Sequence, residues 1–196
     1  MQASSSAEFS VYVAKADFKF NAAHFIVYKG FREKLHGHNY SISVKVTGGE
    51  TIGPDGYLID FGDIKKAARS VCSGMNEYFI CPMKSDAMTI TLSGEQLCME
   101  CEDGSIFSMP KGDCMMLPLV HSSAEELAHY IWCRIIRTIG LESVLSRGLK
   151  SMEVSVSEAP QQTASFMSSI PLNEESLLTL ERCPIKSRPH PCFGDA

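Results

Sequence analysis

An alternating run at residues 36–46 constrains the fold of this chain more than any other feature. At every second position it carries a histidine or an apolar side chain, in the order His36, His38, Tyr40, Ile42, Val44 and Val46. Because successive side chains of a β-strand point to opposite faces, all six share one face if the run is a strand. The run therefore predicts a strand with one buried face, and both imidazoles lie at one end of that face.

A second strand is predicted over residues 9–28, which are rich in aromatic and β-branched residues. One face of this strand carries Phe18, Phe20 and His24. If the two strands are neighbours in one sheet, they present three neutral imidazoles to a single metal ion. Three protein ligands with the fourth position left open is the arrangement of catalytic rather than structural zinc. Histidine pairs at this spacing also occur without a metal, so the pattern by itself leaves both interpretations open.

Two helices are predicted. The first is capped by Asp60 or Asp63 and carries apolar residues at helical spacing, namely Ile64, Ala67, Ala68, Val71 and Met75. The second begins at Ser122 or Ser123, because either serine makes a capping box with the glutamate three residues on. Between the helices, residues 80–118 form short apolar runs separated by turn residues. This segment predicts a small β-meander inserted between the helices.

A last strand is predicted over residues 150–158, and its apolar face ends at Glu158. A carboxylate at the end of an apolar face lies at the rim of the sheet or is buried for a purpose, and the strand alone does not decide which. After Pro160 the periodicity is lost. Residues 171–196 combine Glu, Ser and Pro and are expected to form a poorly ordered tail. Residues 1–170 are then a single domain, which suits a chain of this length.

Charge and hydropathy argue against two classes of partner, nucleic acid and membrane. The formal net charge is -5, and the lysines and arginines are scattered along the chain, whereas a nucleic-acid surface needs clustered basic residues. No window approaches the eighteen consecutive apolar residues of a membrane-spanning helix. The N-terminal residues lack the pattern of a secretory signal, so we expect a cytoplasmic protein that binds neither nucleic acid nor membrane.

The eight cysteines are expected to be reduced thiols. The chain is too long for a disulfide scaffold, and several cysteines fall in helix-like or strand-like runs. Cys98 and Cys101 form the single CxxC pattern, which has no second half at zinc-ribbon spacing. In a strand their thiols point to opposite faces, so we expect a structural role.

The order of these segments resembles that of the 6-pyruvoyl-tetrahydropterin synthase family, whose relatives include the 6-carboxy-tetrahydropterin synthases of queuosine biosynthesis. The shared features are a Phe-x-Ala-x-His strand, a His-Gly-His-Asn-Tyr strand, an Asp-Phe helix start, a serine-rich helix start and a strand that ends in Glu. They cover residues 15–160. The resemblance implies an α+β tunnelling fold, in which an antiparallel four-stranded sheet carries two helices on one face. It also implies homo-trimers or homo-hexamers with sites between subunits.

The resemblance further implies roles for five residues. His24, His36 and His38 match the zinc ligands. Glu158 matches the glutamate that anchors the amino-pyrimidine edge of the pterin, and Ser123 falls where the family places hydroxyl residues beside the pterin. The implied enzyme is a zinc-dependent lyase that acts on 7,8-dihydroneopterin triphosphate. Zinc would acidify the C–H next to the side-chain hydroxyls while triphosphate leaves.

One departure from the family pattern concerns the proton acceptor. Typical members carry a cysteine in the loop before the His-x-His pair, and this chain has no cysteine between residues 1 and 71. Glu33 stands three residues before His36, which resembles a variant subfamily in which Glu replaces Cys and the product is 6-hydroxymethyl-dihydropterin. We therefore expect Glu33 to be the general base, since a carboxylate beside zinc can have a suitable pKa.

A second departure concerns the proton relay. Typical members carry Asp-His after the first helix, where this chain has Asn76 and Glu77. His121, before the second helix, is a possible substitute or an incidental histidine. The product therefore stays open between 6-pyruvoyl-tetrahydropterin and 6-hydroxymethyl-dihydropterin. A pterin-binding homologue that has lost catalysis and a 6-carboxy-tetrahydropterin synthase are the alternatives.

The loop before the His-x-His pair also carries three cations. Lys29, Arg32 and Lys34 are placed to attract a triphosphate, or they are ordinary solvated charges.

Overall fold

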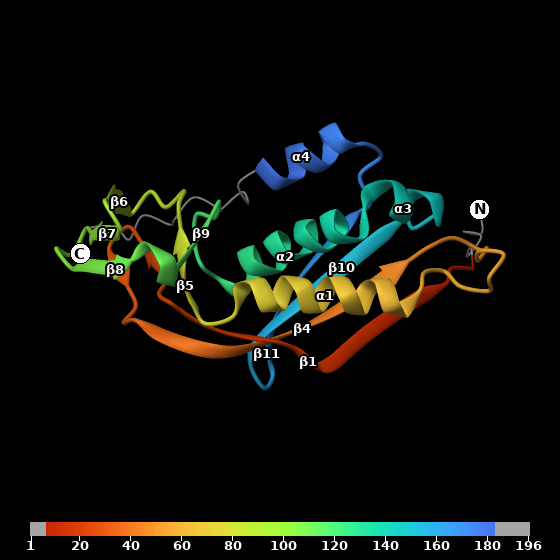
Figure 1. The fold of residues 1–196 in the computed structure, drawn as a ribbon, viewed down its shortest axis with the longest axis horizontal. Coiled ribbons are helices and arrows are strands. Elements are labelled where there is room, and N and C mark those ends of the chain that lie inside the picture. The colour runs from red at the N-terminus through yellow and green to blue at the C-terminus, as the bar shows by residue number, and fades with distance from the viewer. Residues whose placement is uncertain (1–6, 183–196) are drawn as a thin grey trace, which may run out of the picture.

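The fold centres on one mixed sheet, seen in a computed structural model that describes residues 7–182 (Figure 1). Its six strands lie in the order β11, β10, β4, β1, β5 and β9. Four of them form an antiparallel sheet: β1 (Ser10–His24), β4 (His36–Thr47), β10 (Ser151–Ala159) and β11 (Gln162–Ser169). The short strands β5 (Tyr78–Pro82) and β9 (Cys114–Leu117) extend it in parallel. The expected α+β fold is confirmed, with two strands beyond the expected four.

Two helices, α1 (Phe61–Met75) and α2 (Ala124–Ile139), cover one face of the sheet (Figure 1). Asp60 caps α1 by accepting a hydrogen bond from the Gly62 amide at 2.7 Å. Ser123 caps α2, but the expected capping box is one-sided, because the Glu126 carboxylate accepts from the amides of Val120 and His121 instead. Within residues 7–182, no helix is both long enough and apolar enough to cross a membrane.

The main core lies between this sheet and the two helices. Trp132 on α2 is fully buried, and its indole N–H donates to the Met152 carbonyl on β10 at 2.7 Å. The apolar stripe of β4 faces the same core, since Tyr40, Ile42, Val44 and Val46 are all buried. The alternation in residues 36–46 therefore predicted the buried face of this strand correctly.

The inserted meander is a separate three-stranded antiparallel sheet made of β6 (Met88–Ser93), β7 (Gln96–Cys101) and β8 (Ile106–Pro110). A short 3-10 helix, η1 (Lys111–Asp113), leads from it into β9. The meander has a small core of its own, formed by Phe25, Val27, Phe79, Cys81, Ala87, Met88, Leu97, Met99, Cys101 and Cys114. The six cysteines among the described residues are free thiols. Two members of this second core come from the segment that follows β1, so the insertion packs against that segment.

The predicted strand at residues 9–28 is interrupted. β1 ends at His24, and the chain then forms a small hairpin of β2 (Val27–Tyr28) and β3 (Phe31–Arg32). Gly30 makes the turn possible, because its φ of 82° lies in the left-handed region that favours glycine. The hairpin places Glu33 directly before β4.

Two elements occur where no regular structure was expected. The strand β11 follows a tight turn at Gln161, whose φ is 69°, and pairs with β10 along its length. Its inward positions are small or only half-buried, which is why the sequence shows no clear apolar alternation there. After a short α3 (Leu141–Ser146) and the last strands, α4 (Glu174–Arg182) lies within the range 171–196 that was expected to be poorly ordered. The rest of that range, 183–196, lies outside the described residues.

α4 is held by apolar packing of Leu177, with partly buried Leu180 beside it, and by ion pairs to Arg137. Leu177 is completely buried in the main core, and Arg137 on α2 donates to the carboxylates of Glu174 and Glu181. The sequence did not predict this amphipathic helix, because the segment is rich in charged residues and Leu177 is its one fully buried side chain.

Truncation of Leu177 tests whether α4 is part of the folded domain. Leu177→Ala is expected to lower the free energy of unfolding by about 2–4 kcal/mol, since the side chain is fully buried. Leu178→Ala, on the same helix but 39% exposed, is the matched control and should change it by less than about 1 kcal/mol. Urea denaturation measures both, and equal small effects would show that α4 contributes no packing.

Candidate active site

Three histidines meet where β1 ends and β4 begins. His24 is directly opposite His36 in the antiparallel register, and His38 is opposite Ala22. The three ring centroids lie 4.6 to 5.1 Å apart, and one nitrogen from each ring can be chosen so that all lie within 4.8 Å of one another. The predicted adjacency of the three imidazoles is therefore observed, and we call this group the histidine cluster.

Backbone carbonyls orient two of these rings. The Nδ1 atom of His24 lies 2.8 Å from the Ser122 carbonyl oxygen, and that of His36 lies 2.7 Å from the Lys34 carbonyl oxygen. When Nδ1–H donates to a carbonyl, the Nε2 atom carries a free lone pair. A second hydrogen bond of this kind is how proteins fix the tautomer of metal-binding histidines.

His24 supplies the test of whether a metal fits. The residue is only 2% exposed, and its Nε2 atom is the one buried side-chain nitrogen or oxygen in residues 7–182 that has no hydrogen-bond partner. Burial lowers the pKa of His24, which favours the neutral imidazole that a metal requires. An unpaired buried polar atom is costly, so a metal ion at the cluster would satisfy it.

The dipeptide at the start of α2 supports this arrangement. Ser122 is completely buried, and its hydroxyl donates to the Phe25 carbonyl at 3.0 Å while its own carbonyl holds His24. Ser123, the next residue, caps α2 and faces the neighbouring cleft. The helix start and the histidine cluster are thus joined by two adjacent residues.

A cleft of about 390 Å³ adjoins the histidine cluster and brings together most of the predicted site residues. Its lining is His24, Ile26, Glu33, His36, Ser123, Ala124, Glu125, Glu158, Gln162, Thr163 and Ala164. Glu33, Ser123 and Glu158 come from three separate parts of the chain, yet all three line this one cleft. The missed strand β11 contributes the last three residues of the lining, so the sequence could not have supplied them without that strand.

Glu33 is fixed within its loop by backbone contacts. Its Oε2 atom accepts from the Ile26 amide at 3.0 Å, and its own amide donates to the Ile26 carbonyl at 2.9 Å. This reciprocal pair ties the carboxylate to the residue two after His24. The carboxylate consequently lies in the cleft beside the histidine cluster rather than in solvent.

Glu158 lies at the end of β10, where its side chain is 23% exposed. Its Oε1 atom accepts from the hydroxyl of buried Tyr40 at 3.4 Å, and its Oε2 atom lies 4.0 Å from Nε2 of His38. Burial, followed by the nearby Glu158 carboxylate, raises the pKa of Tyr40, so this hydroxyl remains a donor. The carboxylate therefore lies at the rim of the sheet, where it is partly exposed and lines the cleft.

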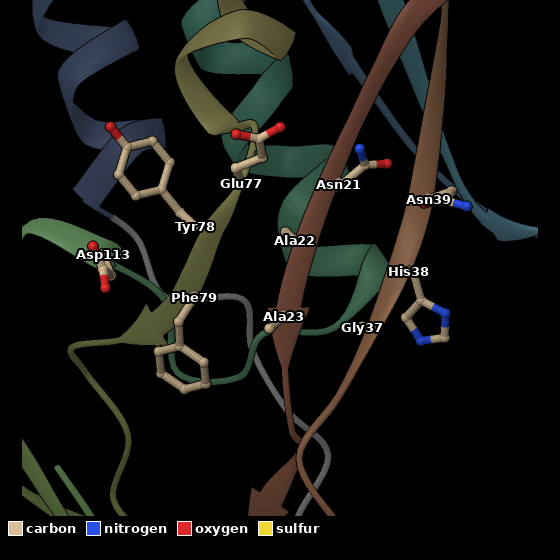
Figure 2. Close-up of a pocket in the computed structure, with 10 residues that line it drawn as sticks. All are labelled: Asn21, Ala22, Ala23, Gly37, His38, Asn39, Glu77, Tyr78, Phe79 and Asp113. Carbon is tan, nitrogen blue, oxygen red and sulfur yellow. The ribbon is translucent and has the colours of Figure 1, made fainter. Parts of the chain in front are cut away.

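The residues at the expected relay positions lie elsewhere. Asn76 ends α1 and accepts from the Asn21 amide at 2.9 Å, whereas Glu77 lines a second hollow of about 500 Å³ together with His38, Tyr78 and Asp113. Figure 2 shows Glu77 beside the end of α1, away from the His38 ring. Neither residue lines the cleft that holds Glu33.

His121 is also turned away from the cleft. Its Nδ1 atom lies 3.1 Å from the Val27 carbonyl oxygen, and its amide donates to Glu126. It is absent from the cleft lining among the described residues. These contacts give it a structural role at the start of α2.

Known proteins match this chain in sequence and in structure. The family model described as 6-pyruvoyl tetrahydropterin synthase matches residues 12–169. A protein of Methanocaldococcus jannaschii, provisionally named 6-carboxy-5,6,7,8-tetrahydropterin synthase, is 27% identical over 154 residues, which is 77% of this chain and 90% of the relative.

Among solved structures, the 6-pyruvoyl tetrahydropterin synthase of Plasmodium vivax is 43% identical, with a TM-score of 0.80, and the match covers 84% of this chain and 99% of that one. The Plasmodium falciparum protein is 41% identical with the same TM-score, and the match covers 83% of this chain and 99% of that one. Two further P. vivax structures replace a glutamate, described as a catalytic residue, by alanine or cysteine. Because the family model spans most of the chain and the fold agrees, this chain belongs to the 6-pyruvoyl tetrahydropterin synthase family, a family of pterin enzymes.

Proposed function

We propose that this protein is a zinc-dependent lyase that acts on 7,8-dihydroneopterin triphosphate and releases 6-pyruvoyl-tetrahydropterin or 6-hydroxymethyl-dihydropterin. The observation that carries this proposal is the cleft beside the histidine cluster, which is lined by Glu33, Glu158 and two of the three histidines, His24 and His36. A base, a metal site and an anchor for a polar heterocycle are the parts that such a reaction needs.

Zinc is proposed because the donor set is three imidazoles, which suits a borderline-soft ion with an open coordination position. His24, His36 and His38 would hold it. When bound, zinc would supply Lewis acidity to the hydroxyls of the substrate side chain. The metal dependence of the family and the unpaired Nε2 atom of His24 both support this assignment.

Glu33 is proposed as the general base. Its carboxylate lines the same cleft as His24 and His36, and the Ile26 amide bonds one of its oxygens while the other remains available to take a proton. The P. vivax relative has a glutamate described as a catalytic residue, which supports a carboxylate in this role in a chain without the usual cysteine.

Glu158 and Ser123 are proposed to hold the pterin. A carboxylate accepts two parallel hydrogen bonds from an amino-pyrimidine edge, in the same way that it accepts two from a guanidinium. The Tyr40 hydroxyl donates to Oε1 of Glu158 and so helps to orient the carboxylate. Ser123 also lines the cleft and carries a hydroxyl.

The three cations of the loop divide into two groups. Arg32 is engaged by Asp103 at 2.8 Å, so its charge is already paired. Lys29 and Lys34 are exposed, and we propose that they attract the triphosphate at long range rather than bind it in a fixed geometry.

Self-assembly into a homo-trimer or homo-hexamer is proposed from the family resemblance. The main sheet ends at β11, an edge strand among the described residues, and unpaired strand edges are usual sites of pairing with another chain. Light scattering during size-exclusion chromatography would measure the mass, and a monomer that is fully active would contradict the assembly.

The decisive experiment is incubation of the zinc-loaded protein with 7,8-dihydroneopterin triphosphate, followed by mass spectrometry. We expect either free triphosphate with a 6-pyruvoyl product, or a 6-hydroxymethyl product with a two-carbon aldehyde that still carries the triphosphate, and the products identify the reaction. A 6-carboxy product would favour the activity named for the M. jannaschii relative instead. Binding of a pterin by isothermal titration without any turnover would favour a homologue that has lost catalysis.

A further inference from the structure

The hairpin of β2 and β3 joins His24 to the strand of the other two histidines and ends immediately before Glu33. Each strand has only two residues. A hairpin this short has little stability alone, so its position depends on what packs against it. What packs against it is the inserted meander.

Arg32, the last residue of β3, connects the meander to the proposed base. Its Nε atom donates to Asp103 at 2.8 Å, and one terminal nitrogen donates to the Ser105 hydroxyl at 2.9 Å. The other terminal nitrogen donates to the backbone carbonyl of Glu33 at 2.9 Å. All three nitrogens of the guanidinium are therefore used, two by the insertion and one by the residue that carries the proposed base.

Two further contacts join the same segments. The Glu102 carboxylate accepts from the amide of Gly30, at the tip of the hairpin, at 3.2 Å. Phe107 on β8 stacks on buried Phe25 with 4.8 Å between ring centroids, and the Arg32 guanidinium carbon lies 5.4 Å from the centre of the Phe107 ring. The meander thus contacts the segment before Glu33 at three places: Phe25 at its start, Gly30 at the hairpin tip and Arg32 at its end.

An ordinary surface ion pair would be a simpler interpretation of Arg32 and Asp103. Such pairs contribute little, and Asp103 is 45% exposed on its side chain. Arg32 is only 20% exposed, however, and its third contact is to the main chain of Glu33 rather than to another charge. It is also absent from the lining of the cleft, so the geometry does not favour direct contact with substrate.

We infer that the 102–107 turn of the inserted meander positions the Glu33 carboxylate, and that Arg32 is the positioning residue that transmits this. The inference rests on the proposed role of Glu33 as base. Arg32 holds the Glu33 backbone at one point, and the reciprocal Ile26 contacts hold it at another. Removing the first contact lets the carboxylate move relative to the histidine cluster.

The kinetic test compares Arg32→Met and Arg32→Lys with Arg69→Met. Arg69 on α1 is a matched control, because it pairs with Asp17 at 2.7 Å and lies 5.9 Å from the Phe18 ring centre, outside the cleft. Both Arg32 variants are expected to lower kcat by about 10- to 100-fold, since a small misplacement of a reacting group has this effect. KM and zinc content should stay within about threefold, and Arg69→Met should match the native protein.

The lysine variant separates positioning from attraction of phosphate. Lysine keeps the charge but cannot make the three-way contact of the guanidinium. If Arg32 attracted the triphosphate, Arg32→Lys would restore activity and Arg32→Met would chiefly raise KM. That result would overturn the inference.

A readout without turnover keeps the inference testable if the substrate assignment fails. The Ile26 amide is bonded by the Glu33 carboxylate, so its hydrogen exchange reports where that carboxylate lies. We expect exchange about fivefold faster in Arg32→Met, the factor that corresponds to one lost hydrogen bond, and unchanged in Arg69→Met. Unchanged exchange in Arg32→Met would overturn the inference.

The Glu33→Ala background distinguishes the two possible failures. Adding Arg32→Met to Glu33→Ala should lower kcat no further, because the two changes act through one group. A further loss would show that Arg32 acts elsewhere and would overturn the inference. Full activity of Glu33→Ala alone would instead overturn the proposed base, and the amide exchange at Ile26 would still decide whether Arg32 positions Glu33.

Discussion

Replacement of Glu33 by alanine is expected to lower kcat by about 100-fold or more while zinc stays bound. General base catalysis by a positioned side chain contributes about 10²- to 10⁴-fold. Glu33 lines the cleft together with His24 and His36, and it precedes His36 by three residues. Glu33→Gln keeps the shape and the acceptor oxygen for the Ile26 amide but removes the basicity. It should therefore lose as much activity as Glu33→Ala.

The control for Glu33 is Glu153→Gln, which neutralises a carboxylate on β10 outside the cleft. Steady-state kinetics with 7,8-dihydroneopterin triphosphate and metal analysis would be carried out on all three variants. If Glu33→Gln retained most of the native kcat, its assignment as base would be wrong. Loss of zinc in the same variant would instead point to a role in the metal site.

Replacement of His24 by alanine is expected to weaken zinc binding by at least about 100-fold, beyond the usual effect of losing an outer-shell partner. The ring is the most buried member of the histidine cluster, and within residues 7–182 its Nε2 atom has no hydrogen-bond partner. Two imidazoles are a poor zinc site, so turnover should be lost together with the metal.

The control for His24 is His129→Gln, which alters another buried histidine, 7% exposed on α2, away from the cluster. Competition with a chelator would give the zinc affinity of each variant. A His24→Ala protein that bound zinc with native affinity would exclude the histidine cluster as the site. Equal losses in both variants would show that general destabilisation, not ligand removal, is being measured.

Local periodicity predicted the strands and helices in which apolar residues recur at a regular spacing. The alternation of β4 and the helical spacing of α1 are confirmed in the structure, including the cap at Asp60. The strand β11 was missed because its inward positions are only partly buried and include just one large apolar residue, Phe166, and α4 because its burial depends mainly on Leu177. The parallel pairing of β5 with β1 joins Ala22 to Tyr78, 56 residues apart, which no local pattern encodes.

The candidate site divides in the same way. The histidine cluster follows from strand spacing once the two strands are neighbours, and the family resemblance supplied Glu33 and Glu158. The hydrogen bond between Arg32 and Asp103 of the inserted meander could not be predicted, since the two residues are 71 positions apart in sequence. Arg32 therefore looked like one of three similar cations until its contacts were known.

The two serines at the start of α2 have a consequence for redesign. Ser122 orients the imidazole of His24 through its carbonyl, and Ser123 sets where the helix begins. A change that shifts the first turn of α2 would therefore rotate the ring of His24, a proposed metal ligand, without replacing any histidine. Stabilising the start of α2 and setting the orientation of the His24 ring are therefore not independent changes in this protein.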